Sequence, residues 1–135
     1  MSIANAARGK IVSVMDKTLV FAPRESNYEL HLQTLEGYEG VINQPIDVVV
    51  RASARKIYTV PSGGLFVSPI RGTPRIVQGR VKAFDQRSLT LQCGVLVTVD
   101  LPTGDGAIDL AEGQIEVGSL VNVVLLPGAR AEIAA

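Results

Sequence analysis

The sequence predicts an all-β fold with little helix, built from two related halves. Nearly half of the 135 residues are apolar, but Trp is absent and Phe and Tyr number three each. Val, Ile and Leu must therefore fill most of the interior, and β-branched residues favour strands. Apolar and polar residues alternate in several short segments, as in half-buried strands. A stretch beginning at Gly9 also recurs from Gly79.

The recurrence is the strongest sign of internal organisation. When GKIVSVMDKTLVF is set above GRVKAFDQRSLTL, nine of the 13 positions are identical or chemically close. Further on, Tyr28 to Leu32 lies over Val97 to Leu101, and Ile46 to Val50 lies over Leu120 to Val124. Because the order of elements is preserved, we prefer a duplicated unit to a chance resemblance between β-rich segments.

Each half is predicted to run strand, tight turn, strand, strand, long polar connection, strand. The tight turns are expected at Asp16-Lys17 and around Asp85, because Asp can bond its own backbone there. Leu30 and Leu32 point to one face of their predicted strand. The connection from Pro102 to Gly118 could hold a short helix at Leu110 to Glu116, which Gly113 weakens.

The ends of the two halves differ. The first half continues into an apolar strand, Gly64 to Ile70, whereas the second ends soon after Arg130 and so lacks a last strand. Since proteins cover open strand edges, we expect Arg75 to Phe84 or another subunit to close this one. The segment around Val123 is apolar on both faces, which predicts a strand covered on both sides, between the halves or against another copy.

The five-strand layout, with its long connection between the third and fourth strands, resembles an oligonucleotide-binding (OB) barrel. The resemblance covers residues 8–70 and, less well, residues 79–133. We therefore expect a tandem of two small OB-like barrel units packed together, the first over residues 1–74 and the second over residues 75–135. Two separate barrels and one interleaved barrel both fit this layout. A likeness of layout implies no particular function.

Catalytic residues are not expected, so the chain is not predicted to be an enzyme. Its one histidine, His31, lies on the polar face of a predicted strand, and its one cysteine, Cys93, alternates with Leu89 and Leu91 as a core residue would. Zinc needs several Cys or His ligands, and the aspartates after Asp100 do not have EF-hand spacing. No metal and no cofactor are expected.

The cytoplasm is the expected location, without a membrane partner. No apolar run approaches the 18 or more residues of a membrane helix. One cysteine excludes an internal disulfide and fits a reducing compartment. The net charge of zero gives no general attraction to nucleic acid or membranes.

The charges are nevertheless segregated along the chain. From Arg51 to Lys82 there are seven basic residues and no acidic one, and from Ser88 to Ala129 there are five acidic residues and no basic one. Strand alternation places three polar side chains on one face of the segment 75–84, and three further arginines could extend this stripe. These six candidate binding residues, here called the basic stripe, are Arg80, Lys82, Gln78, Arg51, Arg55 and Arg71.

Self-association or contact with another protein is the favoured use of the basic stripe. The basic middle of one copy would meet the acidic half of another, making the chain a non-catalytic binding or assembly module and a homo-oligomer. The alternative is an OB-like single-stranded nucleic acid binding protein, which is less favoured because aromatic rings are scarce. A third reading pairs the basic and acidic residues within one chain as exposed ion pairs.

Overall fold

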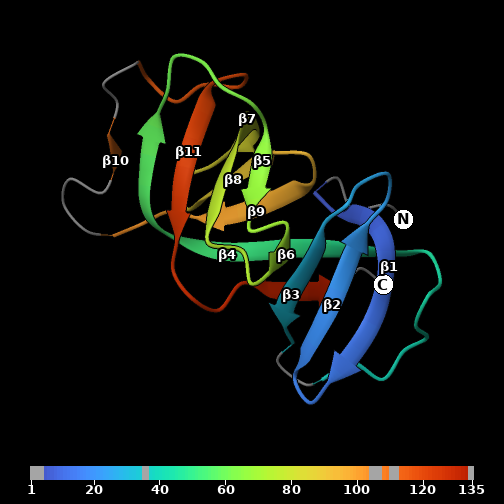
Figure 1. Ribbon diagram of the computed structural model, residues 1–135. Coiled ribbons are helices and arrows are strands. Elements are labelled where there is room, and N and C mark those ends of the chain that lie inside the picture. Colours follow the sequence, from blue (N-terminus) through green and yellow to red (C-terminus); the bar gives the residue numbers. More distant parts are fainter. Residues whose placement is uncertain (1–4, 35–36, 104–107, 110–112, 134–135) are drawn as a thin grey trace.

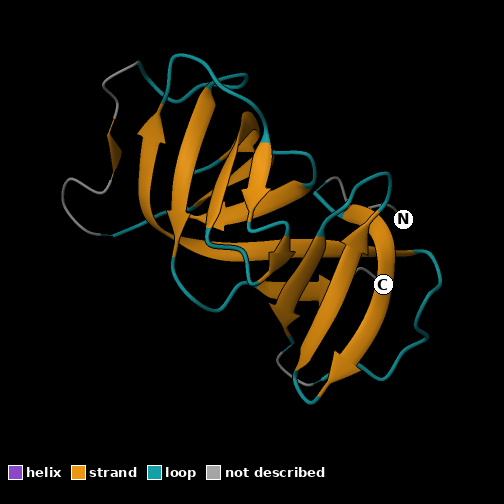
Figure 2. Cartoon of the chain, viewed as in Figure 1, coloured by secondary structure: helices purple, strands orange, loops and turns teal. Residues whose placement is uncertain are grey.

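Every regular element in the described part of the chain is a strand. The computed structural model describes residues 5–34, 37–103, 108–109 and 113–133, and these residues contain no helix (Figure 2). The all-β prediction is confirmed. The strands are β1 (Ala7–Met15), β2 (Thr18–Pro23), β3 (Glu29–Gln33), β4 (Ile46–Thr59), β5 (Phe66–Ser68), β6 (Arg71–Gly72), β7 (Ile76–Phe84), β8 (Ser88–Gln92), β9 (Leu96–Asp100), β10 (Ile108–Asp109), β11 (Leu120–Leu125) and β12 (Arg130–Ile133).

The long strand β4 organises the sheet, which closes partly into rings on either side of it (Figure 1). The first half of β4 pairs with β1 and β12, and the circuit β1–β2–β3–β12–β4 returns to β1; we call it the first ring. From Val50 onward β4 pairs with β9 and β11 in the circuit β4–β11–β7–β8–β9, the second ring, so that Val50 and Arg51 pair with strands of both rings. Closure of the first ring is partial, because a single residue pair, Arg130 with Gln33, joins β12 to β3.

The two hairpins that begin at the repeated glycines have the same pairing register. Lys10 lies opposite Ala22 in β1–β2, and Arg80 lies opposite Gln92 in β7–β8. Both pairs are separated by 70 positions (80 − 10 and 92 − 22). The register shifts between Ile11 and Ser13 in one hairpin and between Val81 and Ala83 in the other, at matching positions. The predicted hairpin turns are confirmed, and the Asp85 carboxylate accepts hydrogen bonds from the backbone N–H groups of Arg87 and Ser88.

Further along, the matching positions differ slightly from the sequence alignment. Leu19 pairs with Leu32, whereas its counterpart Leu89 pairs with Val99. The third strands are therefore offset by 67 positions (99 − 32) instead of the aligned 69, and a slip of two residues keeps the same face inward. In the fourth strands, Gly9 pairs with Ile46 and Gly79 with Val121, an offset of 75 (121 − 46) instead of 74.

Strand β4 closes the strand edge that the sequence predicted to be open in the second half. It pairs in parallel with β9 over Val50 to Ser53 and antiparallel with β11. The expectation that Arg75 to Phe84 or another subunit closes this edge is wrong, because that segment is β7, on the far side of β11. The second half does have a last strand, β12, but it joins the first ring. The sequence halves 1–74 and 75–135 thus each supply strands to both rings.

Strand β11 lies between β4 and β7, which confirms its predicted place between the halves. Its second face is less covered than predicted, because Val124 is only partly buried and Leu126 is exposed. The candidate helix at Leu110 to Glu116 falls partly on residues 110–112, which lie outside the described residues, and residues 113–116 form no regular element.

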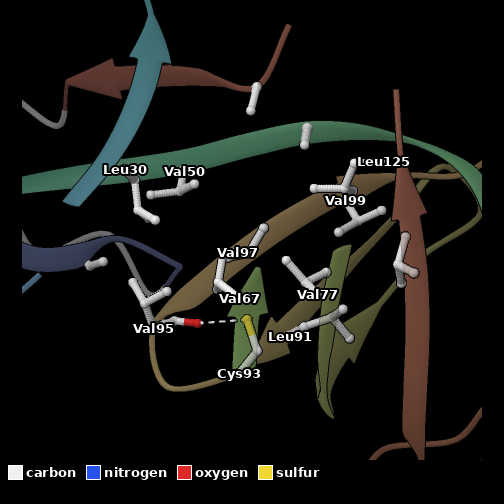
Figure 3. Close-up of a cluster of buried hydrophobic side chains, with 14 of the residues drawn as sticks. Leu30, Val50, Val67, Val77, Leu91, Cys93, Val95, Val97, Val99 and Leu125 are labelled. Atoms are coloured by element: carbon white, nitrogen blue, oxygen red, sulfur yellow. Dashed lines mark hydrogen bonds between the residues drawn. The ribbon is translucent and has the colours of Figure 1, made fainter. Parts of the chain in front are cut away.

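One hydrophobic core runs through both rings beneath β4. Its buried members come from both sequence halves and belong to a single cluster. Figure 3 shows Leu30 of β3 and Val50 of β4 on one side, with Val97 and Val99 of β9 close by. The segment that precedes β7 also contacts the first ring. Its strand β6 pairs with β3, and the backbone N–H of Val67 donates to the Tyr28 hydroxyl at 3.1 Å. The rings are therefore packed as one body.

Gly9 and Gly79 allow each ring's first strand to press against its second. A Cβ added at Gly9 would stand 2.8 Å from the Phe21 ring and from the Pro23 Cα, and one at Gly79 would stand 2.8 Å from the Cys93 Cβ. Real Cβ atoms essentially never approach other atoms so closely. Gly64 has nothing within 4 Å of its Cβ position and makes a matched control.

We predict that Gly9→Ala lowers the free energy of unfolding by about 1 to 3 kcal/mol, because the methyl group overpacks the β1–β2 contact. Gly64→Ala should change it by less than about 0.5 kcal/mol. Urea denaturation followed by circular dichroism measures both variants. Equal stabilities of Gly9→Ala and Gly64→Ala would contradict the tight approach of the two strands.

Candidate binding surfaces

The basic stripe predicted from the sequence does not form one continuous surface. Gln78 is 9% exposed, although strand alternation placed it among the exposed residues. Its amide donates to the Gly64 carbonyl at 2.9 Å and accepts from the Asn122 amide at 3.0 Å. The prediction of an exposed Gln78 fails because Gly63 and Gly64, which precede β5, lie against its side chain, and β5 pairs with β7 at this position.

The other residues of the stripe are separated by the sheet. Arg80, which donates to the Gly118 carbonyl at 3.1 Å, lies opposite Leu120 at the start of β11. Arg55 stands beside the other end of β11, near Leu125. Five residues of strand span roughly 17 Å, so these two arginines cannot act on one small ligand. Lys82 is exposed near Arg80, and exposed Arg71 lies 3.8 Å from Glu29.

Arg51 belongs to an ion-pair network at the crossing of the two rings. Its Nη2 atom lies 2.7 Å from the Asp100 carboxylate, which Arg130 approaches to 3.4 Å from the other side. Glu132 contacts both arginines at 3.7 to 3.9 Å. This network joins β4, β9 and β12, so Arg51 is engaged in holding strands together. Arg51 belongs to the basic segment and Asp100 to the acidic segment. Their contact is the kind of ion pair within one chain that was the third interpretation of the segregated charges.

The surroundings of Asp100 favour its charged form. Burial opposes ionisation of this carboxyl, but the hydrogen bond and charge of Arg51, together with those of Arg130, outweigh it. The pKa of Asp100 is therefore held below its ordinary value of 3.8. A carboxyl with a lowered folded-state pKa stabilises the fold above its unfolded-state pKa, and the stabilisation is lost as the pH falls through the folded-state value.

We predict that Asp100→Asn lowers the free energy of unfolding by about 1 to 2 kcal/mol at neutral pH, because two arginines lose a charged acceptor that is partly exposed to water. The difference from wild type should shrink as the pH falls below about 4. Urea titrations at neutral and acidic pH measure it. Asp16→Asn, at an exposed turn, is the control, and a cost for Asp100→Asn that is independent of pH would contradict the role of its charge.

Cys93 and His31 lie where the sequence predicted. Cys93 is fully buried, and its thiol donates to the Val95 carbonyl at 3.2 Å (Figure 3). Burial raises the pKa of this thiol to about 12. A thiolate is the reactive form of cysteine, so Cys93 is not an available nucleophile near neutral pH. His31 is exposed on β3.

We predict that native Cys93 reacts with Ellman's reagent at least about a hundredfold more slowly than in urea, because reaction requires an opening of the core. The release of thionitrobenzoate, followed by absorbance, measures the rate. Immediate reaction of the native protein would show that Cys93 is accessible, contrary to its position in the core.

Two surface features were not found from the sequence. The first is an apolar edge strip made of Met15, Val41 and Ile42, which are 81%, 67% and 45% exposed. The loop that carries Val41 and Ile42 runs beside β1 (Figure 1) and is fixed by the Asn43 N–H, which donates to the Ile11 carbonyl at 2.8 Å. These residues are distant in sequence, so periodicity could not reveal that they share an edge.

The second feature is a pocket of about 520 Å³ at the open end of the β1–β2 hairpin, where its lining residue Asn43 follows Ile42 of the strip. Three basic side chains reach it from segments that the basic stripe did not include. Only isolated cations were visible in the sequence there, and no charge run marked them. The pocket, here called the β1 pocket, is lined by Arg8, Gly9, Lys10, Ala22, Pro23, Arg24, Glu25, Ser26, Asn43, Gln44 and Pro45.

The described residues form neither a metal-binding cluster nor a membrane-spanning helix. No group of three or more His, Cys, Asp or Glu side chains among them is arranged to hold a metal ion. The same part of the chain has no helix of the length and apolar character needed to cross a membrane.

The fold and these surfaces define the chain as an all-β protein whose sheet closes partly in a ring. No protein-family model matches the chain, and no curated protein or solved structure matches it significantly. The evidence for its function therefore comes from its own surfaces, the apolar edge strip and the β1 pocket.

Proposed function

We propose that the protein is a non-catalytic assembly module, built from two OB-like units, that associates with a second copy through the apolar edge strip. The OB-like description is supported by the order of strands. In an OB barrel, strand 1 pairs with strands 2 and 4, and strand 5 lies between strands 3 and 4. The circuit β1, β2, β3, β12, β4 follows this order, and so does the circuit β7, β8, β9, second half of β4, β11.

In this proposal the units, residues 1–74 and 75–135, have exchanged their fifth strands within one chain. The second half of β4 follows the first unit's fourth strand directly but completes the second ring. Strand β12 belongs to the second unit but completes the first ring. In each ring the third strand pairs in parallel with the fifth strand of the other unit: β3 with β12, and β9 with β4. This common arrangement supports an exchange between equivalent units.

The apolar edge strip carries the proposed assembly. Fully burying a side chain such as Met, Val or Ile contributes about 1.5 to 3 kcal/mol. Three partly exposed side chains from each of two copies would supply roughly 6 to 12 kcal/mol, against an association cost of about 4 to 15 kcal/mol. The association is therefore expected to be weak and dependent on protein concentration.

The charges around the strip favour a second copy as the partner. The exposed rim carries both signs, with Lys10 and Lys17 against Asp16 and Glu39. A two-fold axis brings the same surface of each copy together, so a rim with both signs can complement itself.

A reducing compartment such as the cytoplasm suits the single free thiol.

The nucleic acid alternative has less support from the geometry. OB folds bind oligonucleotides on the face of strands 2 and 3. In the first ring the outward positions of β2 and β3 are Thr18, Val20, Ala22, Glu29, His31 and Gln33, and in the second ring those of β8 and β9 are Ser88, Thr90, Gln92, Leu96, Thr98 and Asp100. Neither set contains Phe, Tyr, Trp, lysine or arginine, so His31 is the one ring in them available for stacking and no cation is there for phosphate contacts.

We predict that the wild-type mass measured by light scattering rises from monomer toward dimer with concentration, and that Met15→Glu with Val41→Glu keeps it monomeric. Val117→Glu is the matched control, because Val117 is 68% exposed but lies on the other ring. Circular dichroism confirms the fold of each variant.

The outcomes separate the candidate contacts. A wild-type protein that stays monomeric at every concentration would contradict the proposal. Dimers that persist in Met15→Glu with Val41→Glu but dissociate in Arg80→Glu with Lys82→Glu would transfer the contact to the basic stripe. Binding of short single-stranded oligonucleotides at low salt, measured by gel shift, would favour the nucleic acid alternative.

A further inference from the structure

The β1 pocket has the size and the residues of a small-molecule site, independently of the proposed assembly. Ligand pockets typically enclose about 300 to 1,000 Å³, and this one measures about 520 Å³. Ala22, Pro23 and Pro45 give it apolar surface, while basic and amide side chains line the remainder. We propose that it binds a small phosphorylated molecule, with the phosphate against the basic residues and an apolar body against the prolines.

The basic residues converge because of local strand geometry. Arg8 and Lys10 lie two positions apart on β1 and so point to the same side. Arg24 follows β2 and is held beside β1 by its own N–H, which donates to the Arg8 carbonyl at 2.8 Å. Three cations against the single carboxylate of Glu25 leave the lining with an excess of positive charge.

The arginines suit a phosphate group. Arg8 lies 3.2 Å from Asp47, outside the lining, which orients the guanidinium and offsets part of its charge. A guanidinium has five N–H donors, and one carboxylate uses only some of them. Lys10 and Arg24 are exposed. Pairing with a phosphate would give charge-assisted hydrogen bonds, which are about twice as strong as neutral ones.

Backbone conformation points to the same place. Glu25 and Asn43 both line the pocket, and both have a φ of 61°. Asn adopts this left-handed conformation more readily than other residues, but for Glu it costs roughly 1 to 2 kcal/mol. The turn around Glu25 is fixed by Ser26, whose hydroxyl donates to the Pro23 carbonyl at 2.8 Å. Such strained positions cluster at ligand-binding sites.

The second ring shows that the pocket is not a general feature of the repeat. At the positions that match Arg8, Lys10 and Asp47, it carries Gln78, Arg80 and Asn122. The Arg8–Asp47 ion pair is thus replaced by the neutral hydrogen bond between Asn122 and Gln78. The pocket that Gln78 and Asn122 line, of about 410 Å³, includes no lysine or arginine. Among the described residues, the matching positions of the second ring therefore do not repeat the cationic lining of the β1 pocket.

The test uses adenosine monophosphate as the probe and adenosine as its uncharged partner, titrated into the ¹⁵N-labelled full chain. We expect saturable shifts of the Gly9, Arg24 and Asn43 amide signals with the monophosphate, weaker affinity at high salt, and no shifts with millimolar adenosine. Lys10→Glu with Arg24→Glu should weaken binding at least roughly tenfold. Lys17→Glu with Arg87→Glu, which reverses two exposed charges elsewhere, should not change it.

Each other outcome overturns the proposal. Absence of shifts with millimolar monophosphate, equal shifts with adenosine, or equal loss in both double variants would mean that the pocket does not select a phosphate. A ten-nucleotide single strand that binds more tightly than the monophosphate, and loses affinity in the pocket variant, would make the pocket a backbone contact for nucleic acid. The single variant Arg24→Gln repeats the test if the double variant does not fold.

Discussion

The structure depends on one strand, β4, that supplies backbone hydrogen bonds to both rings. Strand β4 is 14 residues long and pairs with β1, β12, β9, β10 and β11 along its length. Buried backbone groups must be hydrogen-bonded, so neither ring can close without its half of β4. The small residues Ala52, Ser53 and Ala54 occupy the region where β4 passes from one ring to the other.

This sharing explains the character of the interior and of the crossing. A single core of mostly Val and Leu runs beneath both rings, so the rings are expected to unfold together. The network of Arg51, Asp100, Arg130 and Glu132 lies beside the crossing. Because Asp100 accepts from arginines on two different strands, the network joins β4, β9 and β12 at this point.

The same architecture distributes the charged residues over separate surfaces. Basic residues that follow one another in sequence become separated by β11 or engaged with acidic neighbours, as Arg55 and Arg51 illustrate. The outer side of the first ring instead carries two features, the apolar edge strip and the β1 pocket, which meet in the loop where Ile42 of the strip precedes Asn43 of the pocket. Assembly and ligand binding are therefore proposed for adjoining parts of the same ring, and Lys10 belongs both to the rim of the strip and to the pocket.

A last strand in the second half, β12, was not expected from the sequence, but most other strands, the hairpin turns and the matching of the two hairpins could be predicted. These depend on alternation, on turn residues such as Asp85, and on side chains near one another along the chain, as with the burial of Leu30 and Cys93. Three results depend on the tertiary structure: β12 enters the first ring, the segment leading into β5 buries Gln78, and Arg8, Lys10 and Arg24 share a pocket. Each of these results requires pairing between distant segments, and residue spacing does not specify which of several compatible strand edges will meet.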